Sequence, residues 1–204
     1  MKIKFSKKAK IALIILTICF IILTILMYTN KLLFIDEWMN STIISIRSKK
    51  LTNIMSIITN IGSAYSLIVI TILLFCIIKN KKYPIIITIN LIASFIIGQI
   101  LKFIIRRPRP IDTLIKGIGY SYPSGHSLVS MAYFGLIIYL IGIKINNKNI
   151  KNILIIFNTI LIILISFSRI YLGVHYLTDI VGGMLLAAIY LIVFINIIKK
   201  EPKK

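Results

Sequence analysis

Acidic residues are scarce in this sequence: its 204 residues include 5 Asp and Glu against 25 Lys and Arg, a formal net charge of +20. Cysteine is also scarce, and Cys19 and Cys76 are too few for a disulfide framework. Hydrophobic residues make up 58% of the chain, which excludes intrinsic disorder. Because a soluble globular domain is less apolar and mixes both signs of charge, the composition indicates a membrane protein.

Long runs without Asp, Glu, Lys or Arg recur along the chain, and the basic residues lie between these runs instead of forming the continuous patch of a nucleic-acid-binding protein. Each run approaches or exceeds the roughly 20 residues that cross a hydrocarbon core. We therefore predict an all-α, polytopic membrane protein with a single domain, 1–204, and six transmembrane helices. The predicted spans are approximately 11–30, 58–78, 83–101, 124–143, 152–168 and 180–198.

The distribution of basic residues between alternating loops predicts the orientation, because cytoplasmic loops are enriched in Lys and Arg. One set of segments carries 15 basic residues: the amino terminus, 79–82, 144–151 and the carboxyl terminus. The other set carries 10: 31–50, 102–116 and 169–179. No small-residue cleavage site follows Leu26, so the first span is expected to remain as a helix. Both termini are therefore predicted to be cytoplasmic.

Segment 31–50 has apolar residues at helical spacing, beside polar residues that include Asp36 and Glu37. This pattern is typical of a helix that lies in the membrane interface. We interpret the segment as a connector between the first two spans, with Trp38 at the level of the lipid headgroups.

Polar residues within or beside membrane spans are costly, which makes them candidates for function. Three such segments occur here: 102–110, 123–126 and 168–179. They contain both histidines of the chain and one of its five acidic residues. The predicted topology places all three on the extracytoplasmic side, where we expect a single polar site.

The basic residues of these segments suit a phosphate ester. Lys102 supplies a point charge, and Arg109 and Arg169 supply planar guanidinium groups that match phosphate oxygens. Ser124 and Gly125 precede a predicted helix, whose first backbone N–H groups can hold an oxyanion.

The two histidines add acid–base and nucleophilic chemistry. His175 and Asp179 are four residues apart, so they share one face if a helix begins there, and the carboxylate can orient the imidazole. His126 is a second imidazole that can donate a proton. A nucleophile, an orienting carboxylate, an acid and an oxyanion clamp are thus all present.

Each part of this pattern also has a simpler interpretation. Lys102 and the arginines, taken alone, are typical of interfacial anchors, and Pro123-Ser124-Gly125 alone is typical of a turn and helix cap. The occurrence of all three segments on one predicted face favours a catalytic site.

Lys102-x6-Arg109-Pro110, Pro123-Ser124-Gly125-His126 and Ser168-Arg169-x5-His175-x3-Asp179 match the three-part signature of the type-2 phosphatidic acid phosphatase (PAP2) family. The chain therefore resembles that family, and its six predicted helices resemble the bacterial integral-membrane branch. The resemblance implies that His175 attacks phosphorus to form a phosphohistidine, that Asp179 orients His175, and that His126 protonates the leaving oxygen. It also implies a set of residues that hold the phosphoryl group: Lys102, Arg109, Ser124, Gly125 and Arg169.

The resemblance further implies catalysis without a metal or another cofactor, and the sequence has no cluster of carboxylates typical of a Mg²⁺ site. Arg106 and Arg107 lie outside the signature, and we interpret them as contacts to lipid headgroups or to the interface. As surplus arginines near the mouth of the site, they are also candidates to hold a second phosphate.

The resemblance therefore implies a phosphatase in a bacterial plasma membrane that hydrolyses a phosphomonoester or diphosphate of a lipid. Undecaprenyl diphosphate is the favoured substrate, followed by phosphatidylglycerol phosphate or phosphatidic acid. Lipid phosphotransfer is an alternative, because an acceptor alcohol can resolve a phosphohistidine as water does. A non-catalytic transporter or scaffold is a third. The expected partners are the lipid substrate and anionic membrane lipids, with neither nucleic acid nor an obligate protein partner.

Overall fold

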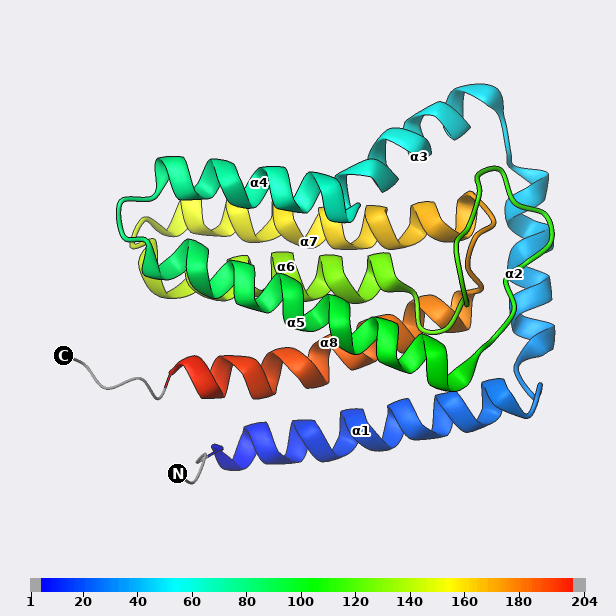
Figure 1. The fold of residues 1–204 in the computed structure, drawn as a ribbon, viewed down its shortest axis with the longest axis horizontal. Coiled ribbons are helices and arrows are strands. Elements are labelled where there is room, and N and C mark those ends of the chain that lie inside the picture. Colours follow the sequence, from blue (N-terminus) through cyan, green and yellow to red (C-terminus); the bar gives the residue numbers. More distant parts are fainter. Residues whose placement is uncertain (1–4, 200–204) are drawn as a thin grey trace.

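The structure is a computed structural model and describes residues 5–199. Within that range the chain forms eight α-helices and no β-strand (Figure 1). The helices are α1 (Lys7–Tyr28), α2 (Leu33–Ser45), α3 (Lys49–Ile61), α4 (Ala64–Ile77), α5 (Lys82–Ile105), α6 (Gly125–Lys144), α7 (Lys148–Tyr171) and α8 (Leu177–Ile198). Five of the lysines counted for the orientation lie outside the described residues: Lys2, Lys4, Lys200, Lys203 and Lys204.

Five helices, α1, α5, α6, α7 and α8, are each long and apolar enough to cross a membrane. Helices α3 and α4 reach that length and apolarity only as a pair, bent by 53° at the break between them. The outer faces carry exposed apolar side chains, such as Ile14 (59% exposed) on α1 and Ile153 (65% exposed) on α7. Such a surface belongs in lipid, so the chain is a multi-pass membrane protein.

The charge-free run that contains the predicted span 58–78 is two helices in the structure. Helix α4 starts anew because the Ser63 hydroxyl accepts a hydrogen bond from the Ser66 backbone N–H, as a helix N-cap does. Gly62 lies against α6 at the bend, where a Cβ atom would come within 2.9 Å of the Ser130 hydroxyl oxygen. The bend thus directs the end of α3 and the start of α4 toward the interior of the bundle.

Helix α6 occupies the middle of the bundle and packs against α5, α7 and α8, whereas α1 packs against α8 (Figure 1). The main apolar core forms among α4, α5, α6, α7 and α8, with Leu67, Tyr133, Leu136 and Ile165 all fully buried. The connections 106–124 and 172–176 meet at one end of this bundle, next to α2 (Figure 1).

Helix α2 occupies part of the segment interpreted as an interfacial connector and lies across that end of the bundle (Figure 1). Trp38 is 63% exposed, as suits a headgroup anchor, and Ile43 packs in an apolar cluster with Leu172 and Val174. Asp36 is not part of the exposed polar face expected for an interfacial helix, because it is only 1% exposed and points into the protein.

Candidate active site

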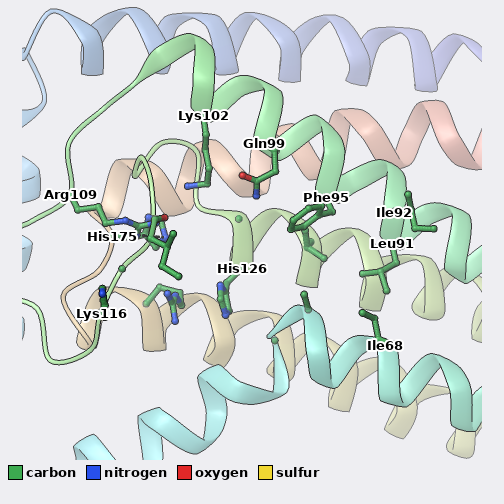
Figure 2. Close-up of a pocket in the computed structure, with 18 residues that line it drawn as sticks. Ile68, Leu91, Ile92, Phe95, Gln99, Lys102, Arg109, Lys116, His126 and His175 are labelled. Carbon is green, nitrogen blue, oxygen red and sulfur yellow. Dashed lines mark hydrogen bonds between the residues drawn. The ribbon is translucent and has the colours of Figure 1, made fainter.

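The three polar segments predicted to form one site do meet at one end of the bundle. They belong to the end of α5 with the connection 106–124, the start of α6, and the end of α7 with the start of α8. A cavity of about 530 Å³ lies among them (Figure 2). Six of the eight predicted site residues line it: Lys102, Arg109, Gly125, His126, Arg169 and His175. The other two, Ser124 and Asp179, are fully buried beside it.

His175 lies between α7 and α8 and is held from both sides of its ring. Its Nδ1 is 3.2 Å from Oδ2 of Asp179, and its Nε2 is 3.2 Å from Nη1 of Arg109. A carboxylate only accepts and a guanidinium only donates, so both contacts select the tautomer with the proton on Nδ1 and a lone pair on Nε2. Burial lowers the pKa of His175 to about 4, despite the opposing hydrogen bond to Asp179. The imidazole is therefore neutral at pH 7, with a lone pair on Nε2.

Asp179 is positioned by the first turn of α8. Its Oδ2 also accepts the backbone N–H of Tyr176 at 3.0 Å, which fixes the carboxylate at the positive end of the helix. The start of α6 is close to α8 because Gly183 has no side chain: a Cβ there would lie 2.7 Å from the Ser124 carbonyl oxygen. The backbone N–H of Ser124 donates to the Asp179 carbonyl oxygen at 3.0 Å, which connects two of the three motifs directly.

Arg109 and Lys102 are held by backbone carbonyl oxygens of the connections 106–124 and 172–176. The Arg109 guanidinium donates to the carbonyl oxygens of Ile118 (2.7 Å) and Val174 (2.7 Å), among others. The Lys102 ammonium donates to the Tyr120 carbonyl oxygen at 2.6 Å. These bonds turn both cations toward the cavity, where Figure 2 shows them beside His175.

Arg169 adds a third cation from α7. Its Nη1 donates to the hydroxyl of Thr59 on α3 at 2.6 Å, whereas its buried Nε has no hydrogen-bond partner. A buried donor without a partner is costly, and Arg169 itself lines the cavity, where an anion would balance its charge. Sequence reasoning missed Thr59, because nothing in α3 marks a residue that contacts Arg169 across 110 positions.

At the start of α6, one motif residue caps the helix and the next two lie at the cavity. The Ser124 hydroxyl accepts from the backbone N–H of Ser127 at 3.4 Å and caps the helix, away from the cavity. Gly125 leaves room beside Lys102, since a Cβ there would lie 3.7 Å from the lysine Cε. His126 lines the cavity and has no hydrogen-bond partner within residues 5–199, so its ring is available to a ligand (Figure 2).

The interpretation of Arg107 as a headgroup contact, or as a ligand of a second phosphate, is wrong. Its side chain is only 11% exposed, and its Nη1 donates to Oδ1 of Asp179 at 2.6 Å. Its Nη2 donates to Oδ2 of Asp36 at 2.6 Å. Burial alone would lower the pKa of Arg107, but these two carboxylates raise it, so the guanidinium is charged and paired with both of them. Arg106, in contrast, is exposed at the end of α5.

The cavity continues from its cationic end along an apolar wall. Five apolar side chains from α4, α5 and α6 line this part: Ile68, Leu91, Ile92, Phe95 and Val129. Ile68, Ile92 and Phe95 are each about half exposed, and Figure 2 shows them along the cavity on α4 and α5. The arrangement suits a molecule with an anionic head and an apolar tail.

No group of three or more His, Cys, Asp or Glu side chains within the described part of the chain is arranged to hold a metal ion. The cations Lys102, Arg109 and Arg169 are instead the residues that converge on the cavity. Metal-independent catalysis stays a prediction.

Comparison with known proteins matches residues 83–203 to the PAP2 superfamily. Phosphatidylglycerophosphatase B of Bacillus subtilis (strain 168) is 28% identical over 170 residues, which cover 80% of this chain and 83% of that protein. Undecaprenyl-diphosphatase BcrC of the same strain is 32% identical over 146 residues, 68% of this chain and 70% of the relative.

The fold is similar to a crystal structure described as the first transmembrane PAP2 type phosphatidylglycerolphosphate phosphatase from Bacillus subtilis. The TM-score is 0.85 at 25% sequence identity, and the match covers 94% of this chain and 98% of that one. The similarity therefore extends over nearly the whole of both chains.

Proposed function

Because the chain belongs to the PAP2 superfamily, we propose that it is a phosphatase that hydrolyses a phosphate or diphosphate ester of a membrane lipid. The observation that carries this proposal is one cavity with four cations and two imidazoles at one end and an apolar wall at the other. A soluble phosphate ester has no apolar chain to bury against this wall, whereas the tail of a lipid would be buried along it.

The proposed reaction runs through His175. Its Nε2 lone pair attacks the terminal phosphorus, and the bond from that phosphorus to the leaving oxygen breaks. The leaving oxygen is the lipid oxygen of a phosphate ester or the bridging oxygen of a diphosphate, and His126 gives it a proton. Water then attacks the phosphohistidine and gives a proton back to His126, which releases phosphate and restores both histidines. Asp179 stabilises the positive charge on the ring, and the cations around the cavity stabilise the charge that develops on the phosphoryl oxygens.

We assign the phosphoryl oxygens to Lys102, Arg109 and Arg169, with the first turn of α6 at Gly125 beside them. The unpartnered Nε of Arg169 and the closeness of Gly125 to Lys102 support this assignment. Ser124 contributes by capping α6 and so directing its N-terminal turn.

Undecaprenyl diphosphate is the substrate that we favour, with phosphatidylglycerol phosphate and phosphatidic acid next. The names of the two relatives support the first two of these. Since Arg107 is engaged by carboxylates, we assign the second phosphate of a diphosphate to Lys116, which lines the cavity and has no ion-pair partner within residues 5–199. Lys116→Gln should lower kcat/KM for a prenyl diphosphate by about tenfold, as loss of one charge-assisted contact does, and change that for phosphatidic acid little. Exposed Lys31→Gln is the matched control.

We also propose that the bundle spans the plasma membrane six times, with α3 and α4 forming one bent span. Both termini then face the cytoplasm and the cavity opens on the extracytoplasmic side. The bias of basic residues supports this orientation.

The experiment that tests the function is phosphate release from a panel of lipid phosphates and diphosphates by the purified protein, with and without an acceptor lipid. Release that requires His175 supports hydrolysis, and transfer to the acceptor without free phosphate would indicate a phosphotransferase. Equal release by the wild-type protein and His175→Ala would contradict the proposed site.

A further inference from the structure

Asp36 on α2 is buried against the start of α8, although neither its own helix nor the motif segments identify it as part of the site. Its Oδ1 accepts the backbone N–H of Thr178 at 3.0 Å, and its Oδ2 accepts the Thr178 hydroxyl at 2.7 Å. The same Oδ2 pairs with Arg107 at 2.6 Å. Asp36 therefore caps the first turn of α8 from another helix and neutralises an arginine at once.

The second partner of that arginine is the carboxylate that holds His175. Arg107 reaches Asp36 with Nη2 and Asp179 with Nη1, and its guanidinium lies 4.1 Å from the centre of the Tyr176 ring. Asp179 turns its other oxygen toward Nδ1 of His175. The four charged or ionisable groups thus form a chain: Asp36, Arg107, Asp179 and His175.

The charges along this chain set the net electrostatic charge next to the His175 imidazole. With Asp36 present, two carboxylates and one guanidinium leave a net charge of −1 next to His175. Without it, the positive charge of Arg107 would bear on Asp179 alone and cancel the carboxylate that stabilises a cationic ring. Because all four side chains are largely or fully buried, water screens these interactions weakly.

We propose that Asp36 is a positioning residue for the reaction: it holds and neutralises Arg107, so that Asp179 keeps its negative charge for His175 during formation of the phosphohistidine. This inference rests on the proposed function. It makes α2 part of the catalytic apparatus, although no residue of α2 lines the cavity.

A purely structural role would also account for a buried contact between α2 and α8, so the test must separate charge from fit. Asp36→Asn removes the charge but keeps an oxygen that can accept the Thr178 N–H. The double variant Asp36→Asn, Arg107→Gln removes both charges and returns Asp179 to a net charge of −1. The matched control is Glu37→Gln, the same change of charge at the next, exposed position of α2.

The experiment measures kcat and KM for a lipid phosphate, together with the thermal midpoint in detergent, for the wild type, His175→Ala and these variants. Asp36→Asn should lower kcat by about tenfold or more, while KM stays within about twofold, because the cations that hold the phosphoryl group are untouched. Glu37→Gln should match the wild type. The double variant should recover most of the lost kcat. It restores the net charge beside His175 but not the original contacts, so a role in packing alone would predict no recovery.

Three outcomes would overturn the inference while the proposed function stands. Asp36→Asn could be as active as Glu37→Gln, or a folded double variant could be no more active than Asp36→Asn. The third outcome is that Asp36→Asn itself fails to fold. If only the double variant fails to fold, Asp36→Glu replaces it, since it keeps the charge and disturbs the fit. Activity close to the wild type then supports the charge role, and activity as low as that of Asp36→Asn overturns it. A wild-type protein no more active than His175→Ala would overturn the proposed function, and the inference with it.

Discussion

Arg109 donates a hydrogen bond from Nη1 to Nε2 of His175 across 3.2 Å. The nitrogen proposed to attack phosphorus therefore has its lone pair directed at a cation when no phosphate is bound. A phosphoryl group that enters between them would accept the guanidinium N–H and leave the lone pair free to attack. The same contact that holds the ring in the productive tautomer thus gives way to the substrate.

The tautomer and charge of His175 can be measured directly, because the chain has only two histidines. In ¹⁵N-histidine-labelled His126→Gln protein without a histidine tag, we expect a neutral ring protonated at Nδ1 at pH 7. Since burial lowers the pKa of His175 to about 4, the ring should stay neutral as the pH falls to about 5, where an unperturbed imidazole is charged. NMR chemical shifts of Nδ1 and Nε2 check both points. A protonated Nε2 at pH 7, or a cationic ring at pH 6, would contradict the geometry.

The proposed acid role of His126 predicts a dependence on the leaving group. His126→Ala should slow phosphate release from lipid phosphomonoesters by roughly 10²–10⁴-fold. Their leaving group is an alkoxide, which needs a proton to leave. An aryl phosphate has a better leaving group, so the phosphoenzyme should still form from it. Rapid-quench labelling measures that step, and His175→Ala, which should form no phosphoenzyme from either substrate, is the control. Equal losses with both leaving groups would remove His126 from the acid role.

Arg107 should matter to stability far more than its neighbour. Arg107→Gln leaves Asp36 and Asp179 buried without their shared cation, which should cost about 3 kcal/mol and lower the midpoint of thermal or denaturant unfolding in detergent. Arg106→Gln, the same substitution at an exposed side chain, should change the midpoint little. Similar midpoints for the two variants would show that the paired carboxylates do not depend on Arg107.

The proposed orientation predicts which loops a reagent reaches from outside the cell. In a background with Cys19 and Cys76 replaced by alanine, a cysteine at Thr113 should react with an impermeant maleimide in intact cells. Thr113 is exposed in the connection 106–124. A cysteine at Asn146, exposed between α6 and α7, should react only after the cells are opened. The reverse pattern would place the cavity on the cytoplasmic side.

Six of the residues that line the cavity could be predicted from the sequence, because each motif has a recognisable spacing and the predicted topology brings the motifs to one end. Two features could not. A charge-free run such as 51–78 carries no sign of a bend, since the break depends on Ser63 as a cap and on Gly62 packing against α6. The pairing of Arg107 with Asp36, 71 residues away, depends on how α2 lies over α8, which neither segment specifies alone.

The apolar wall of the cavity has a consequence for how the protein meets its substrate. Ile68, Ile92 and Phe95 line that wall on α4 and α5, and each of these side chains is about half exposed in a bundle that lipid would surround. If the substrate is a lipid, as proposed, one that arrives along this wall would come from the two-dimensional pool of the surrounding leaflet. The encounter rate is then set by lateral diffusion and by the number of phosphorylated lipids per unit of membrane area. Neighbouring lipids without a phosphate group would compete for the same entrance. The reaction rate should therefore depend on the lipid composition of the leaflet as well as on the amount of substrate.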